Sequence, residues 1–224
     1  MRAVAAVISV ALALTLSHGV APAHSARPLL GGSDLAWAGL GDSYSSGEGI
    51  PGTSTTPDWR GRDCQRADGK ATNAVAWAPG ARAQAGGELG VATFAFTACT
   101  GAVADDAADQ LAEAEQLVGS RPWDIVTFSF GGNNIGFADV IKGCIDVNGW
   151  DVFDLTPGCD ISEQELRARI DMLVGNREIG PGYVGTTTLP DLYNTVANSV
   201  RPGGDVIVLG YPQVVEEAGR CPQR

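Results

Sequence analysis

The sequence predicts an α/β protein in which a parallel sheet lies between two layers of helices. Two observations lead to this prediction. Short apolar or β-branched runs, each ended by glycine or a polar turn, are typical of buried strands, and helical patterns separate them. The expected strands are residues 35–40, 91–97, 125–130 and 206–209. Because strands that alternate with helices form parallel sheets with both faces covered, the predicted fold class is a three-layer αβα sandwich.

The helices are predicted from their periodicity and their ends. Between the second and third strands, alanine and aliphatic residues recur every three or four positions over 104–118, and Gly119 ends the pattern. After the third strand, Ser162 and Glu165 form a capping box at the start of another helix. Pro190 is suited to the first turn of a last helix, where its missing N–H costs nothing.

Two segments have no period and are predicted to be irregular excursions. Residues 50–68 are rich in glycine, proline, threonine, arginine and aspartate, and residues 142–161 contain two cysteines. Loops of this kind often shape binding sites, which in an open parallel sheet lie at the carboxyl ends of the strands.

The N-terminus has the pattern of a secretory signal peptide. Met1-Arg2 precedes a short apolar run that ends at the small-residue site Ala21-Pro22-Ala23. The run is shorter than the roughly 20 residues of a membrane span, so we expect no stable membrane insertion. The expected organisation is a signal peptide over 1–23, a linker over 24–34 and one domain over 35–224, in a protein that is secreted to the extracellular space.

Composition narrows the function classes. The 224 residues carry a formal net charge of −11, which repels phosphate backbones and makes nucleic-acid binding unexpected. The sequence has no metal or cofactor signature, and we expect a monomer without a cofactor. Five acidic residues of the helix at 104–118 are interpreted as a solvated surface rather than a metal site: Asp105, Asp106, Asp109, Glu113 and Glu115.

The five cysteines favour disulfides, as expected in an exported chain. The first four permit three pairings, of which Cys64–Cys99 with Cys144–Cys159 is the simplest because both loops close locally. Cys221 is then left over, and its alternatives are an intermolecular disulfide, a free thiol or a partner beyond the given C-terminus.

The tails of the first three predicted strands concentrate small polar residues at one edge of the sheet. These tails are Gly41-Asp42-Ser43, residues 98–102 and residues 131–134. Together they offer a serine nucleophile, backbone N–H groups that a substrate can approach closely, and a side-chain amide donor at one edge.

In this order, the three segments resemble the first three blocks of the SGNH hydrolases, also called the GDSL esterase and lipase family, and in particular its secreted bacterial lipase-like branch. The resemblance implies that Ser43 is the catalytic serine of a lipid or small-molecule ester hydrolase. It also implies an oxyanion hole formed by the Ser43 N–H, the Gly101 N–H and the Asn133 side chain. The two disulfides proposed above are implied by that branch as well.

The chain departs from the family pattern in two places. Asn134 stands where the third block usually has aspartate, which alters neighbouring hydrogen bonds and leaves the Asn133 donor intact. The last block with its catalytic histidine has no counterpart, because the only histidines are His18 and His24. Since serine needs a general base, we expect a C-terminally incomplete domain with little or no turnover as written. The alternatives are a carbohydrate acetyl esterase and a non-catalytic lipid- or carbohydrate-binding relative.

Overall fold

The computed structural model describes residues 34–51, 53–58, 60–69, 75–137 and 162–211. The chain divides into two compact units, and one of them, Gly31–Leu209, contains all the described helices and strands. Four features of the sequence analysis lie outside the described residues: the predicted signal peptide, the proposed Cys144–Cys159 disulfide, the irregular segment 142–161 and Cys221.

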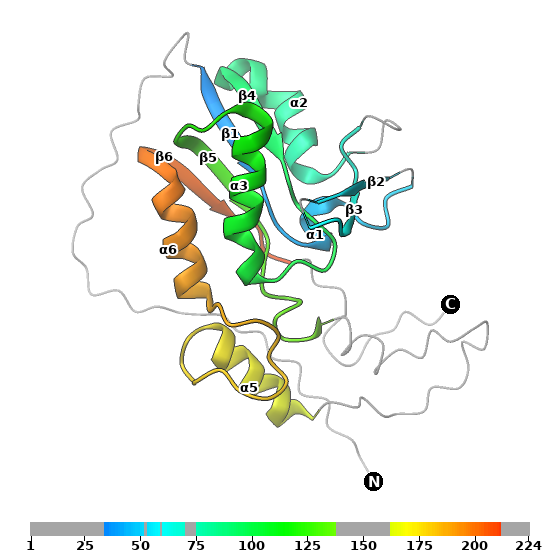
Figure 1. The fold of residues 1–224 in the computed structure, drawn as a ribbon, viewed down its shortest axis with the longest axis vertical. Helices are drawn as coiled ribbons and strands as arrows, with labels where there is room; N and C mark the ends of the chain where they lie inside the picture. The colour runs from blue at the N-terminus through cyan, green and yellow to red at the C-terminus, as the bar shows by residue number, and fades with distance from the viewer. Residues whose placement is uncertain (1–33, 52, 59, 70–74, 138–161, 212–224) are drawn as a thin grey trace, which may run out of the picture. The chain divides into compact units, whose positions relative to one another are not determined.

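The predicted parallel sheet is confirmed. Its strands are β1 (Leu35–Gly39), β4 (Val91–Phe96), β5 (Trp123–Phe128) and β6 (Val200–Val208), in the spatial order β4-β1-β5-β6 (Figure 1). All neighbouring pairs of this sheet are parallel. β6 begins earlier than predicted, and a register irregularity opposite Trp123 to Ile125 accommodates its Pro-Gly-Gly segment.

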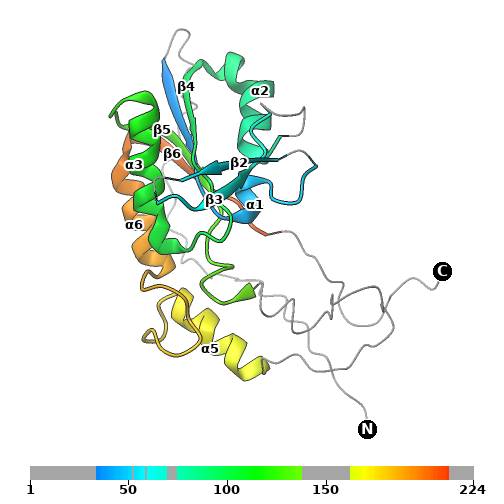
Figure 2. The same cartoon turned by 45° about the vertical axis from the view of Figure 1, so that its right-hand side comes forward.

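Helices cover both faces of the sheet, so the three-layer fold class is confirmed. α3 (Ala107–Val118) and α6 (Leu189–Ser199) lie on one face, and α2 (Trp77–Leu89) lies on the other (Figure 2). Alternate residues of β1 supply the two cores, as the period of a strand requires. The core under α3 and α6 includes Ala36, Ala38, Leu40, Leu111, Phe128, Leu192 and Val196. The core under α2 is built from Trp37, Ala78 and Val91.

The predicted helix ends are confirmed. Gly119 follows α3 and donates its N–H to the Glu115 carbonyl at 2.8 Å. α5 (Glu163–Leu173) begins after Ser162, whose hydroxyl accepts the Glu165 N–H at 3.1 Å as one half of the predicted capping box, while the Glu165 carboxylate pairs with Arg169 at 2.6 Å. Pro190 lies in the first turn of α6. No local signal predicted α2, which contains Pro79 and three glycines, residues of low helix propensity. None of the helices in the described segments is long and apolar enough to cross a membrane.

The prediction that residues 50–68 are irregular is wrong for two strands within the segment. β2 (Ser54–Pro57) and β3 (Asp63–Arg66) form an antiparallel hairpin. The Cys64–Cys99 disulfide is confirmed and joins this hairpin to the segment after β4. Beside it, buried Arg66 donates to the Ala98 carbonyl at 2.8 Å and to the Thr97 carbonyl at 3.1 Å.

The acidic residues of α3 and the 3-10 turn before it, η1 (Ala104–Asp106), are not simply solvated, which corrects the prediction. Asp106 is almost fully buried and pairs with Arg60 at 2.7 Å and with Arg62 at 3.2 Å. Glu113 pairs with Arg66 at 3.0 Å. All three arginines belong to the β2-β3 hairpin. The acidic side chains that were predicted to face solvent therefore hold this hairpin against the helix layer.

Candidate active site

The turn after β1 positions the predicted nucleophile. Gly41 has a φ of 128°, and a Cβ there would lie 2.6 Å from the Cβ of Ser45 and 2.7 Å from the Ser129 carbonyl oxygen. Only glycine fits this position without displacing its neighbours. The chain then enters the single-turn helix α1 (Ser43–Ser46), so Ser43 is its first residue, is partly exposed, and has an N–H without an intrahelical acceptor.

A buried network of side-chain hydrogen bonds holds this turn to the tail of β5. The carboxylate of Asp42, 1% exposed, accepts hydrogen bonds from the Tyr44 N–H at 3.1 Å and from the Ser129 hydroxyl at 2.8 Å. The Ser129 and Ser45 hydroxyls share a further hydrogen bond of 2.7 Å. Asp42 therefore acts as the N-cap of α1 and holds it to the neighbouring strand.

Backbone hydrogen bonds continue the sheet into the tails of its strands. The Cys99 N–H donates to the Gly41 carbonyl at 2.9 Å, and the Asp42 N–H donates to the Ser129 carbonyl at 3.0 Å. The tail of β1 is thus bonded on one side to the tail of β4 and on the other to the tail of β5. Ser43 follows directly on this central tail.

The predicted donors Gly101 and Asn133 lie on the two outer tails. Asn133 bridges them, because its side-chain amide donates to the Ala102 carbonyl at 2.8 Å and keeps a second N–H. Gly101 is exposed with a φ of 74°, and a Cβ there would meet no atom within 4 Å. The structure therefore brings the tails that carry Ser43, Gly101 and Asn133 to one edge of the sheet, with open space at Gly101.

Asn134 is fully buried and structural. Its side chain accepts the Ala104 N–H at 2.9 Å and donates to the Val184 carbonyl at 2.8 Å. An aspartate here could make only the first of these bonds, which gives a physical reason for asparagine at this position.

The carboxylate of Asp105 also holds the loop between α5 and α6 that contains Val184. The Asp105 carboxylate accepts hydrogen bonds from the Thr186 N–H at 2.8 Å and the Thr187 N–H at 3.2 Å. Burial by itself would raise the pKa of Asp105, but the hydrogen bonds from Thr186 and Thr187 outweigh it and hold the pKa below its ordinary value. Burial, together with the negative charge of Asp105, raises the pKa of Tyr183 to about 12.

Sequence reasoning missed Gln110 on α3, which is 3% exposed and bonded to the backbone of Gly41. A signal was present, because Gln110 shares the apolar face of this helix with Ala107, Leu111 and Ala114. A polar residue on a buried stripe needs a hydrogen-bond partner, and the partner here is the turn that leads to Ser43.

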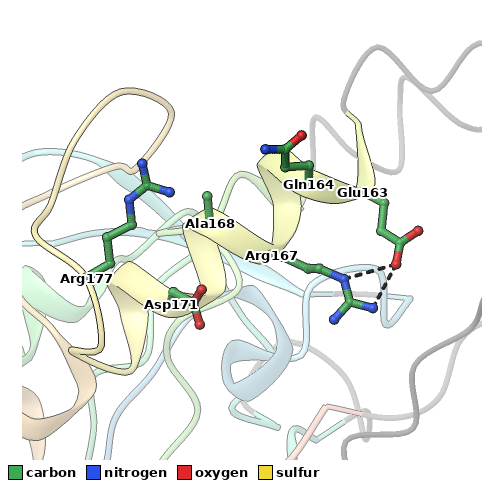
Figure 3. Close-up of a pocket in the computed structure, with 6 residues that line it drawn as sticks. All are labelled: Glu163, Gln164, Arg167, Ala168, Asp171 and Arg177. Carbon is green, nitrogen blue, oxygen red and sulfur yellow. Dashed lines mark hydrogen bonds and ion pairs between the residues drawn. The ribbon is translucent and has the colours of Figure 1, made fainter.

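Other features of the described residues do not compete with this site. Asp58, Cys64 and Cys99 have the spacing of metal ligands, but the two sulfurs are joined in the disulfide and Asp58 binds Arg62. A hollow of about 510 Å³ lies on α5, where Glu163 and Arg167 form an exposed ion pair (Figure 3). It contains no hydroxyl or thiol that could act as a nucleophile.

The fold and this cluster define an α/β protein with a parallel sheet whose strand tails gather serine, glycine and asparagine at one edge. The chain is similar to Lipase 1 of Streptomyces coelicolor, with 28% identity over 96% of this chain and 64% of that protein. It is also similar to a lipase of Streptomyces rimosus, with 31% identity over 83% of this chain and 55% of that protein. The chain thus spans less than two thirds of the length of each relative.

Two solved structures share the fold. They are phospholipase A1 from Streptomyces albidoflavus, with a TM-score of 0.52 and 28% identity, and the extracellular lipase from Streptomyces rimosus, with a TM-score of 0.51 and 27% identity. Each match covers 84% of this chain and 64% of the other. No protein-family model matches the sequence.

Proposed function

We propose that this chain carries the nucleophile and oxyanion hole of a secreted lipid ester hydrolase of the SGNH type. The observation that supports the proposal most is the hydrogen bonding of the tail that carries Ser43 to the neighbouring tails of β4 and β5, which carry Gly101 and Asn133. The similarity to Streptomyces lipases and a phospholipase A1 favours lipid esters over carbohydrate acetyl esters. The disulfide and the extracellular lipase among the relatives support secretion.

In the proposed reaction, the Ser43 Oγ attacks the ester carbonyl carbon while a general base takes its proton. The C–O bond to the alcohol then breaks, the alcohol leaves with a proton, and water hydrolyses the acyl-enzyme. Negative charge on the carbonyl oxygen is stabilised by the Ser43 N–H, the Gly101 N–H and the Asn133 amide. By mutational precedent, one such donor contributes about 2.7 to 4 kcal/mol.

The general base is not assigned to a described residue, because both histidines of the chain, His18 and His24, lie outside the described segments. The proposal is therefore tested by stoichiometric labelling, which does not require turnover, with free imidazole added to take the Ser43 proton. An activated alkyl phosphonate should transfer its alkylphosphonyl group to the Ser43 Oγ as the P–O bond to its 4-nitrophenol leaving group breaks. Peptide mass spectrometry identifies the modified residue, and released nitrophenol gives the rate.

Ser43→Ala should lose the label, whereas the exposed control Ser120→Ala should keep it. A label that survives in Ser43→Ala would place the nucleophile elsewhere. Complete absence of reaction in the parent chain would favour a non-catalytic binding relative. Where turnover is measurable, preference for long over short acyl nitrophenyl esters separates a lipase from an acetyl esterase.

A further inference from the structure

We infer that Gln110 is a positioning residue for the nucleophile. Its side-chain amide forms two hydrogen bonds with a single residue two positions before Ser43. Gln110 Oε1 accepts the Gly41 N–H at 2.7 Å, and Gln110 Nε2 donates to the Gly41 carbonyl at 2.9 Å. The inference rests on the proposed role of Ser43.

The two bonds occupy both backbone groups of Gly41. The Gly41 carbonyl also accepts the Cys99 N–H at 2.9 Å, so both of its lone pairs have a donor. With φ at 128° and no room for a Cβ, Gly41 is the bend that sends the chain from β1 into α1. Because the planar amide restrains the N–H and the C=O at once, it limits rotation of the bend that carries Ser43.

Gln110 is itself held firmly. Its backbone carbonyl accepts the Thr97 hydroxyl at 3.0 Å, and its neighbour Leu111 lies in the core between α3 and the sheet. Gln110 thus connects the helix layer to the tail of β1 through its side-chain amide and to the tail of β4 through its backbone carbonyl. A buried group in this setting cannot exchange its partner for water, so losing both bonds leaves the Gly41 N–H unsatisfied and the Gly41 carbonyl with only the Cys99 N–H.

Two substitutions separate the roles of the amide. Gln110→Glu keeps the shape and the acceptor for the Gly41 N–H but puts an oxygen against the Gly41 carbonyl. Gln110→Met keeps the length and removes both bonds. A displacement of about 1 Å at a reacting group can lower the rate by up to about 100-fold, so we expect phosphonylation of Ser43 to slow by roughly 10- to 100-fold in both variants. The loss should fall on the rate of the chemical step, with the affinity for the phosphonate nearly unchanged.

Protonation gives a readout that a general loss of stability would not reproduce. The protonated carboxyl of Gln110→Glu has an O–H that can donate to the Gly41 carbonyl, and burial raises the pKa of such a group. The rate of Gln110→Glu relative to the parent at the same pH should therefore recover as the pH is lowered. The ratio for Gln110→Met should stay flat. Absence of recovery in Gln110→Glu would overturn the inference.

Thr127→Val is the matched control, because it removes the buried hydrogen bond of 3.0 Å from the Trp37 indole on the α2 face of the sheet. It should lower stability and leave labelling of Ser43 within about 2-fold of the parent. If the Gln110 variants label as fast as this control, the inference is wrong.

Amide hydrogen exchange tests the inference in the full chain even without labelling. Exchange at Gly41, Asp42 and Ser43 should accelerate at least about 10-fold in Gln110→Met relative to Thr127→Val, because the bend opens locally. Equal exchange in the two variants would overturn the inference. If exchange responds but the parent is not phosphonylated, Gln110 holds the turn and the proposed nucleophilic function is wrong.

Discussion

Replacing the confirmed disulfide by alanines in Cys64→Ala/Cys99→Ala should lower the free energy of unfolding by about 4 kcal/mol. The two cysteines are 35 positions apart, and the loop-closure relation gives roughly 3.8 kcal/mol for a loop of this length. Both residues are fully buried, so the lost sulfur contacts add to the effect. The hairpin should stay docked in the native state, because Arg66 still binds the Thr97 and Ala98 carbonyls.

Urea unfolding followed by fluorescence of the buried Trp37 and Trp123 measures this change. The dependence of the free energy on urea should also become steeper, because the unfolded chain is no longer cross-linked and exposes more surface. Parent protein unfolded with reductant should approach the midpoint of the variant. A loss below about 1 kcal/mol, with unchanged urea dependence, would show that loop closure in the unfolded state does not govern the stability of this domain.

Three further predictions concern the charged and titratable contacts. Arg66→Ala should destabilise the fold by about 3 to 5 kcal/mol, because it leaves the largely buried Glu113 carboxylate without its partner. Adding Glu113→Gln to this variant should recover part of the loss. An unchanged melting temperature of Arg66→Ala would contradict the prediction. Because the folded-state pKa of Asp105 is lowered, its contribution to stability is present above the unfolded-state pKa of about 3.9 and is lost as the pH falls through the lower folded-state pKa. In urea titrations at acid pH, the free energy of unfolding should therefore depend less on pH in Asp105→Asn than in the parent. An identical pH dependence would refute the assignment. The folded-state pKa of Tyr183, about 12, exceeds the unfolded-state pKa of about 10, so the stability contributed by its neutral phenol declines as the pH rises above 10. Ultraviolet titration of Tyr183→Phe should lack the phenol that ionises near pH 12. Loss of an ionisation near pH 10 instead would contradict the raised pKa.

Local signals in the sequence predicted the elements whose causes are local. The apolar runs of β1, β4 and β5, the glycine after α3, and the serine cap of α5 act through neighbouring residues, and the structure contains each of them. α2 and the β2-β3 hairpin were missed for a shared reason. Their own propensities are weak, and contacts distant in sequence hold them, namely the packing of Trp37 against Trp77 and the Cys64–Cys99 disulfide.

The sequence by itself determined the α/β class, the parallel sheet and the three strand tails that carry Ser43, Gly101 and Asn133, since alternation of strands and helices sends those tails to one edge. Only the tertiary structure decided which buried groups hold the tails in place. Gln110 meets Gly41 across 69 positions of the chain, and Asn133 meets the Ala102 carbonyl across 31. Such pairings depend on how layers pack, because a side-chain amide has no preferred partner until folding removes water from both groups.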